Sequence, residues 1–264
     1  MTPAAHSRRA VLVAAGAAVL AACTRSRSSA RSAPAPTPSP AVPSPAGPVP
    51  SADATHAAAS PPAGTSVVRH ADTGRAEVAL TFHGSGEPAL ADRLLTEAER
   101  GGAAITVFAV GTWLQAHPEM AQRILHGGHA LGNHTYTHPT LHRLSPAGIE
   151  DEVSRCAKLL SRLIGNPGAA FRPSGGPSIT PPMVQAATAS GYRLVLGYDV
   201  DPSDNLDPGA SAVASRVLAG VRRGSVVSLH LGHEGTVEAL PHILAGLRSR
   251  GLTAVTAPSL VAPT

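Results

Sequence analysis

The stretch VALTFHGSGEP, residues 78–88, changes character within a few positions. Its first half is an uninterrupted apolar run of the kind that forms a buried strand. The run stops at His83, passes through Gly84-Ser85-Gly86 and reaches Pro88, a residue favoured in the first turn of a helix. This strand–loop–helix unit predicts an α/β fold if the same unit recurs along the chain.

The unit does recur as far as the C-terminus. We predict strands at residues 78–82, 104–110, 130–133, 169–172, 193–200, 225–230 and 253–255. We predict helices at residues 88–100, 113–125, 146–164, 181–190, 212–221 and 237–248. Strict alternation predicts a parallel sheet covered by helices, either an open doubly wound sheet or a barrel. About seven strands suit a distorted, incomplete (β/α) barrel.

An export signal precedes this region. Arg8 and Arg9 are followed by an uncharged run of Ala, Val and Leu that is too short to span a bilayer. The motif LAAC, which ends at Cys23, resembles the lipobox of bacterial lipoproteins, where cleavage precedes the cysteine and the cysteine is lipidated. We predict a lipoprotein signal peptide at residues 1–22 and a protein anchored through Cys23 to the outer face of the cell membrane. An ordinary cleaved signal with a chance cysteine is the alternative.

The segment after Cys23 is rich in Pro, Ala and Ser and shows no apolar periodicity. Such a chain buries too little apolar surface to offset its ordering entropy. We predict a disordered linker at residues 23–66 and a folded domain at residues 67–264. Neither Sec nor twin-arginine export is decided by the sequence, although Ser7-Arg8-Arg9 weakly resembles a twin-arginine signal.

The sequence pI of about 9.7 comes from the N-terminal segments. Five of the 21 Lys and Arg residues and one of the 17 acidic residues precede Ser66, which leaves sixteen of each sign in the predicted domain. A balanced domain has no basic excess to pair with phosphates. We therefore expect no nucleic-acid partner, and nothing in the sequence indicates a protein partner.

Cys156 is the second of two cysteines. If Cys23 carries lipid, Cys156 is alone and forms no disulfide. It belongs to an apolar stripe with helical spacing formed by Ile149, Val153, Cys156, Leu160 and Leu163. We interpret Cys156 as a small core residue, and a reactive thiol is the alternative.

Polar side chains gather where the predicted strands end. In parallel β/α folds, ligands bind at the carboxyl ends of the strands. His83 ends the first strand, His134 and His138 follow the third, and Arg172 ends the fourth. The fifth strand runs into YDVDPSDN with Asp199, Asp201 and Asp204, and the sixth into SLHLGH with His230 and His233.

The segment HTYTH places His134 and His138 four residues apart. On one side of a helical turn, two imidazoles at this spacing can bind one divalent metal. Zinc suits imidazole ligands, as do cobalt and nickel. Because thirteen histidines are scattered along the chain, solvated or capping histidines remain the alternative.

The elements TF, HTYTH, FRPSGG, DVDPSDN and LH occur in this order at suitable intervals. Together they resemble the NodB-type polysaccharide deacetylases, carbohydrate esterase family 4, from about Glu77 to the C-terminus. The resemblance implies a distorted, incomplete (β/α) barrel that removes acetyl groups from a sugar polymer. It implies a divalent metal that polarises the acetyl carbonyl, a first-strand Asp as base, and a second Asp that joins two His on the metal.

The first motif departs from the family pattern Thr-Phe-Asp-Asp-Gly, because His83 and Gly84 replace both carboxylates. In one hypothesis His83 is a third metal ligand with His134 and His138, and the base is Asp201 or Glu87. In a second, His83 is the base, as its ordinary pKa allows. In a third, the site is inactive and the domain binds wall polymer.

The resemblance also assigns the remaining site residues. Arg172 and Asp201 occupy orienting positions, and His230 is the acid that protonates the leaving group. A surface ion pair for Arg172 and a backbone-bonded strand-end histidine for His230 are the alternatives. Ser174, Gly175, Asn205, Ser228 and Leu231 depart from the family pattern. Aromatic residues make up 3% of the chain, which is few for stacking on sugars.

Two functions therefore compete. One is a metal-dependent hydrolase that removes acetyl groups from peptidoglycan or a chitin-like amino sugar. The other is a catalytically inactive deacetylase-like lipoprotein that binds acetylated wall polysaccharide. A serine esterase built on Ser85 and His230 is a poor third, because HGSGE lacks the G-x-S-x-G frame.

We expect Cys23→Ser to abolish membrane attachment, because the change removes the sulfur that would be acylated. In a bacterial host that processes lipoproteins, detergent phase separation should move the variant from the detergent phase to the aqueous phase. The matched control, Cys156→Ser, should stay with the detergent. A Cys23→Ser protein that also stays there would rule out the lipid anchor.

Overall fold

A computed structural model describes residues 64–263. Its strands are β1 (Ser66–Val68), β2 (Glu77–Gly84), β3 (Thr106–Ala109), β4 (Ala130–Asn133), β5 (Leu194–Leu196), β6 (Val226–His230) and β7 (Thr253–Ala254). Its α-helices are α1 (Pro88–Arg100), α2 (Gly111–Ala116), α3 (Glu119–His126), α4 (Pro146–Ile164), α5 (Pro181–Ala189), α6 (Ala210–Gly220), α7 (Glu234–Ser249) and α8 (Ala257–Val261). Two 3₁₀ turns, η1 (Leu141–Arg143) and η2 (Asp204–Leu206), complete the elements of this region.

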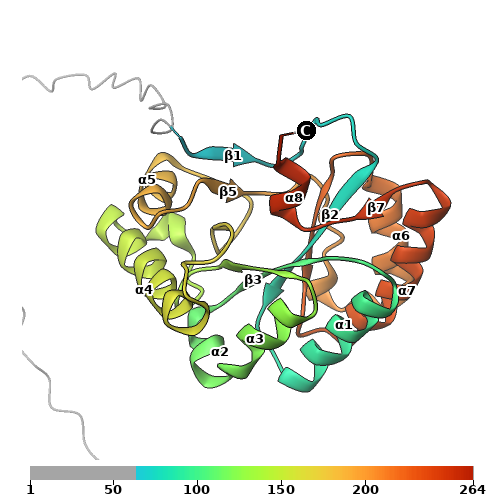
Figure 1. Cartoon of the computed structure of the whole chain (residues 1–264), viewed down its shortest axis with the longest axis horizontal. Coiled ribbons are helices and arrows are strands. Elements are labelled where there is room, and N and C mark those ends of the chain that lie inside the picture. Colours follow the sequence, from blue (N-terminus) through green and yellow to red (C-terminus); the bar gives the residue numbers. More distant parts are fainter. Residues whose placement is uncertain (1–63, 264) are drawn as a thin grey trace, which may run out of the picture. The chain divides into compact units, whose positions relative to one another are not determined.

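The strands form an incomplete barrel with helices on its outside (Figure 1). One sheet has the order β4-β3-β2-β6, with β7 also paired to β2, and a second sheet pairs β1 with β5. Every one of these ladders is parallel. Single bridges link the two sheets at Phe171, between Asn133 and Val195, and at Val200 with Val227. The predicted α/β barrel with about seven parallel strands is therefore confirmed. The two sheets are joined at these bridges by fewer backbone hydrogen bonds than join the strands within each sheet.

Two strands differ from the predictions. Residues 169–172 contribute only the bridge at Phe171, so the predicted fourth strand is reduced to a single point of contact. The short strand β1 was not predicted, and it begins at Ser66, one residue before the predicted domain boundary. Thr65 is already buried, and its hydroxyl donates to the carbonyl of Tyr192 at 3.2 Å. Pairing with the distant strand β5 stabilises this segment, and no local sequence pattern predicts that pairing.

The helices follow local signals closely. Helices α1 and α4 have the predicted bounds, and the Ser145 hydroxyl caps α4 by accepting from the Gly148 amide at 3.2 Å. Helix α4 ends at Gly165, whose φ of 80° is the left-handed conformation that glycine adopts readily. The single helix predicted at residues 113–125 is instead two helices, because Pro118 cannot continue α2.

Three apolar clusters fill the interior, and the largest lies between the barrel and helices α1, α2, α3, α4, α6 and α7. Cys156 is completely buried in it, as the helical stripe predicted. Burial raises the pKa of the Cys156 thiol to about 12, so the thiolate that would react is disfavoured. The structure supports the core interpretation of this residue.

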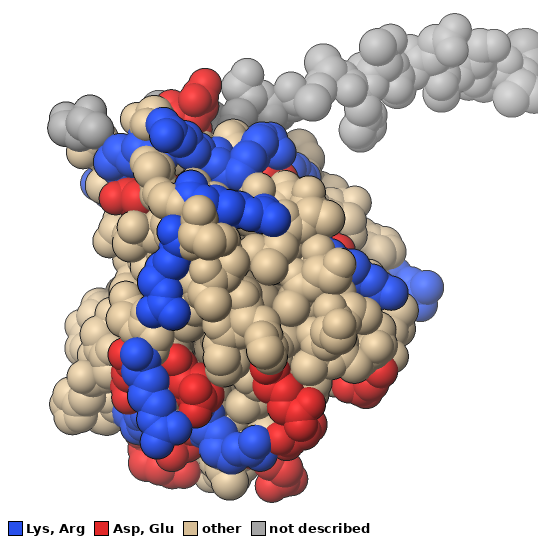
Figure 2. All heavy atoms as spheres, turned by 90° about the vertical axis from the view of Figure 1, so that its right-hand side faces the viewer, with Lys and Arg blue, Asp and Glu red and all other residues tan. Residues whose placement is uncertain are grey.

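The predicted signal peptide, Cys23 and nearly all of the predicted linker lie outside the described residues. Within residues 64–263, no helix is long and apolar enough to cross a membrane. Both signs of charge occur on the face shown in Figure 2, where basic and acidic side chains lie next to each other near the top and near the bottom. Ion pairs such as Arg93–Glu234, at 2.6 Å, join neighbouring helices.

Strands β2 and β3 approach each other closely at Gly84. A Cβ atom at this position would lie 2.8 Å from Val107 Cγ1 and 2.9 Å from the Ala109 Cα atom. Both separations are below van der Waals contact, and the second involves backbone. Gly84 is therefore required by the approach of β3.

We expect Gly84→Ala to lower the free energy of unfolding by about 1–3 kcal/mol, because the added methyl group overpacks the sheet. Gly148→Ala is the matched control, since its new Cβ would meet nothing closer than 3.4 Å and it lies in α4. This control should be neutral or stabilising by roughly 0.5–1 kcal/mol. Urea titrations of both variants test the prediction, which fails if Gly84→Ala is as stable as the parent.

Candidate active site

The site is built around His83, the penultimate residue of β2. Strand β6 lies beside β2 in parallel register, so that His83 is opposite His230. The Nδ1 atom of His83 lies 2.9 Å from Nε2 of His230, and the ring centroids are 4.4 Å apart. Two histidines separated by 147 positions thus form a direct hydrogen bond at the carboxyl ends of adjacent strands.

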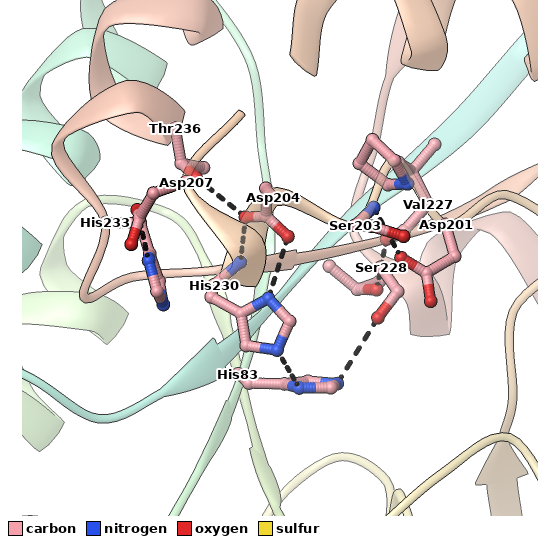
Figure 3. A network of polar contacts seen from close by, with 12 residues as sticks. His83, Asp201, Ser203, Asp204, Asp207, Val227, Ser228, His230, His233 and Thr236 are labelled. Carbon is pink, nitrogen blue, oxygen red and sulfur yellow. Dashed lines mark hydrogen bonds and ion pairs between the residues drawn. The ribbon is translucent and has the colours of Figure 1, made fainter. Parts of the chain in front are cut away.

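His230 is in turn held by Asp204 in η2 (Figure 3). Oδ1 of Asp204 accepts from Nδ1 of His230 at 2.8 Å, and Oδ2 accepts from the His230 amide at 2.8 Å and from the Thr236 hydroxyl at 2.7 Å. The Asp204 side chain is fully buried. A buried carboxylate needs such a complete set of donors.

This arrangement corrects the predicted partner of His230, which was Asp201. Asp201 is exposed, and its Oδ1 accepts from the Ser203 amide at 2.8 Å. Ser203 has a left-handed φ of 53°, and the turn it makes brings Asp204 rather than Asp201 against β6. Asp199, Asp201 and Asp204 fall within six residues, and no local pattern distinguishes which of them contacts His230.

The Asp204 contact determines the direction of the hydrogen bonds. An ionised carboxylate only accepts, so Nδ1 of His230 carries a proton. In the neutral ring, Nε2 of His230 is then an acceptor, and Nδ1 of His83 donates to it. The lone pair of neutral His83 consequently resides on Nε2, which lies 3.4 Å from the Ser228 hydroxyl.

His134 lies on the other side of His83, with ring centroids 4.3 Å apart. Its Nδ1 donates to the Arg172 carbonyl at 2.9 Å, so its lone pair is on Nε2. That Nε2 atom is buried and has no hydrogen-bond partner among the described residues. Burial lowers the pKa values of His83 and His134 well below the ordinary value, and their cationic neighbours add to the effect.

The HTYTH segment is a strained loop, which corrects the predicted helical turn. Thr135 and His138 have left-handed φ values of 69° and 59°, and the rings of His134 and His138 lie 4.9 Å apart. Buried Glu152 of α4 holds the loop by accepting from the amides of Tyr136 and Thr137 at 2.9 and 2.8 Å. The sequence motifs did not identify Glu152. A glutamate beside the apolar face of a helix could have done so, because a buried carboxylate must accept hydrogen bonds from other parts of the chain.

Arg172 is buried and does not form the surface ion pair considered as its alternative role. It is 1% exposed, and its Nε and Nη2 donate to the carbonyls of Leu196 and Gly197 at 3.2 and 3.0 Å. Its guanidinium lies over the Phe108 ring at 4.4 Å from the centroid. Burial lowers the pKa of Arg172, and Nη1 has no hydrogen-bond partner among residues 64–263.

The predicted three-histidine metal site is not formed. In residues 64–263, no group of three or more His, Cys, Asp or Glu side chains is arranged to hold a metal ion. Hydrogen bonds to His230 and Ser228 engage both ring nitrogens of His83. The unpartnered Nε2 of His134 does fit a metal, and His138 is the second imidazole beside it. Gly84 leaves no room for a third, carboxylate ligand unless β3 moves.

Two residues near the glycine-rich loop lie outside the group of histidines. Glu87, proposed with Asp201 as a base, is exposed just before α1. Trp113 is buried, and its indole N–H donates to the Gly86 carbonyl at 2.8 Å, which ties α2 to the glycine-rich loop. Trp113 therefore fixes the position of the glycine-rich loop that follows His83.

Known proteins resemble this chain in sequence and in fold. The sequence profile of the family named polysaccharide deacetylase matches residues 70–195. A chitooligosaccharide deacetylase of Bradyrhizobium sp. (strain ANU 289) is 30% identical over 71% of this chain and 92% of its own length. The chain belongs to the polysaccharide deacetylase family. The resemblance inferred from the motifs is thereby confirmed.

Two further proteins resemble this member of the polysaccharide deacetylase family, one in sequence and one in structure. A peptidoglycan-N-acetylglucosamine deacetylase of Bacillus cereus (strain ATCC 14579) is 30% identical over 70% of this chain and 68% of its own length. The crystal structure of a family pseudoenzyme from Bacillus anthracis superposes with a TM-score of 0.70. That structure covers 77% of this chain and 70% of its own at 23% identity, and it supports the fold alone.

We expect Asp204→Asn to lower the free energy of unfolding by about 1.5–3 kcal/mol, because a buried, charged acceptor of three hydrogen bonds is lost. The same change should alter the ring-nitrogen resonances of His230 and His83 in nitrogen NMR spectra, since it removes the group that sets their tautomers. Asp201→Asn is the isosteric control and should change stability by less than about 0.5 kcal/mol. Equal effects of both substitutions would contradict the assignment of Asp204.

Proposed function

We propose that this protein removes acetyl groups from the N-acetylated amino sugars of a cell-wall polysaccharide of the peptidoglycan type. The observation that carries the proposal is the hydrogen-bonded chain from Asp204 through His230 to His83 at the strand ends. This chain keeps an acid and a base although both first-strand carboxylates are absent. The relatives named for peptidoglycan and chitooligosaccharide substrates support the substrate class.

In this proposal His83 is the base. Its Nε2 lone pair takes a proton from the nucleophile, and its Nδ1 proton moves toward His230. His230 becomes an imidazolium stabilised by buried Asp204, as required of a group that later protonates the leaving amine. Base and acid are thus directly joined, and a proton taken by one is available to the other.

His134 and His138 are the residues that would hold a divalent metal, with zinc first and cobalt or nickel as alternatives. Such a metal would act as a Lewis acid toward the acetyl carbonyl. With two imidazoles and no carboxylate from position 84, the protein supplies fewer ligands than the three of most catalytic zinc sites. We therefore expect the metal to bind weakly and to be removed readily by a chelator.

We also propose that the protein works outside the cytoplasm, anchored to the outer face of the membrane through lipidated Cys23. The proposal rests on the signal-like residues 1–22 and on the LAAC motif. A Pro-rich spacer up to the start of β1 would let the domain reach wall polymer.

A second candidate function is non-catalytic binding of wall polysaccharide. It is favoured by one observation, the replacement of both first-strand carboxylates by His83 and Gly84, where β3 leaves no space for a side chain at position 84. A pseudoenzyme of the same family from Bacillus anthracis has the same fold, so the fold by itself does not require catalytic activity.

The deciding experiment measures acetate release from peptidoglycan and chitooligosaccharides, and zinc content after dialysis, on the chain from Thr24 onward. We expect His83→Ala to reduce acetate release by roughly 10²–10⁴-fold, the usual contribution of a general base. His83→Ala should keep its zinc, whereas His134→Ala should lose it.

Other outcomes have distinct meanings. Loss of zinc in both variants would make His83 a ligand and contradict its role as base. A parent that releases no acetate but co-sediments with purified peptidoglycan would establish the binding function instead. Circular dichroism and the protection of the Cys156 thiol verify that each variant is folded.

A further inference from the structure

Ser228 lies at the end of the hydrogen-bonded chain. It is in β6, opposite Thr81 of β2 and two residues before His230, on the same face of the strand as His230. The residue is 2% exposed, and its hydroxyl lies 3.4 Å from Nε2 of His83. Figure 3 shows the side chains of Ser228, His83, His230 and Asp204 in sequence.

The hydrogen bond between Asp204 and His230 determines which group donates in the hydrogen bond between Ser228 and His83. Asp204 fixes the proton of His230 on Nδ1, and this in turn places the His83 proton on Nδ1 and the His83 lone pair on Nε2. The Ser228 hydroxyl is therefore the donor to His83. A hydroxyl that donates to an imidazole, which is itself oriented through a carboxylate, is the arrangement of an activated nucleophile.

We propose that Ser228 is a catalytic nucleophile that carries the acetyl group as an acetyl-serine. The inference rests on the proposed deacetylation and replaces direct attack of water on the amide with transfer of the acetyl group to Ser228, followed by hydrolysis of the ester. It also gives a role to Ser228, one of the residues that depart from the family pattern.

Water is the one reactant that the two steps need besides the acetylated sugar. The Ser228 oxygen attacks the acetyl carbonyl carbon while its proton passes to Nε2 of His83. The His83 Nδ1 proton moves toward His230, and the Asp204 carboxylate stabilises the resulting imidazolium. The amide C–N bond then breaks, and the relay returns the proton to the leaving amine. In the second half, water gives its proton to His83 and attacks the ester, the C–O bond breaks, Ser228 regains its proton and acetate leaves.

The surroundings suit a small acyl group. Ser228 is 2% exposed, so a bulky acyl group could not approach its hydroxyl. Arg172 is buried nearby with one N–H group that has no partner among the described residues, and its charge acts on His83. This charge would stabilise the oxyanion that forms during attack.

Other buried serines lack these contacts. The Ser225 hydroxyl donates to Asp199 at 3.1 Å, and that of Ser174 donates to the Pro139 carbonyl at 2.6 Å. In the described part of the chain, neither hydroxyl is bonded to a histidine. Ser225→Ala is therefore a matched control, because it removes a buried hydroxyl from the residue just before β6 without touching the hydrogen bonds of His83.

The experiment treats the chain from Thr24 onward with p-nitrophenyl acetate, quenches in acid and locates acetyl groups by peptide mass spectrometry. We expect one acetyl group on Ser228 in the parent and in Ser225→Ala, and none at this position in His83→Ala. Ser228→Ala should show no burst of p-nitrophenol. p-Nitrophenyl butyrate should acylate the parent roughly tenfold more slowly or worse.

The results separate this inference from the proposed function. A parent without acetyl on Ser228, or a Ser228→Ala variant that releases acetate from peptidoglycan at the parental rate, would overturn the inference and leave the deacetylase proposal intact. Acetylated Ser228 in a protein inactive on every polymer would support the inference and contradict the polymer substrate. Should Ser228→Ala fail to fold, Ser228→Cys replaces it, and a hydroxylamine-labile thioester at that position is the expected product.

Discussion

The parallel register of β2 and β6 is the constraint on which the site depends. It places His83 opposite His230 at strand ends that the sheet backbone holds in fixed positions. The 2.9 Å contact between the two rings follows from this pairing and from no local feature of either motif. Because neighbouring strands position both partners, the contact needs little further ordering of the chain.

Buried acidic residues hold the loops around that contact. Asp204 accepts hydrogen bonds from His230 and Thr236, and Glu152 accepts from the backbone of the HTYTH loop. Among residues 64–263, neither carboxylate pairs with a cation of Lys or Arg. Each is instead stabilised by several hydrogen-bond donors, which allows a charge to remain buried. The strained left-handed residues Thr135, His138 and Ser203 persist because these bonds determine their conformations.

The absence of carboxylates at positions 83 and 84 goes with a distinct set of contacts. The two ring nitrogens of His83 contact His230 and Ser228, and β3 lies too close to Gly84 for a side chain there. Arg172 stays buried beside the rings with no acidic partner among residues 64–263. The site is therefore a histidine relay with a pair of imidazoles next to it, and it differs in charge from one built on two aspartates.

Local patterns in the sequence determined the helices, the main strands and the barrel class, because caps, prolines and apolar periodicity act over a few residues. They also placed His83, His134, His138, Arg172 and His230 at strand ends. Tertiary structure alone decided that Asp204 rather than Asp201 holds His230, that HTYTH is a loop, that Glu152 supports it and that β1 joins the sheet. Those outcomes depend on contacts between residues far apart in the chain, for which equivalent side chains compete and only packing selects among them.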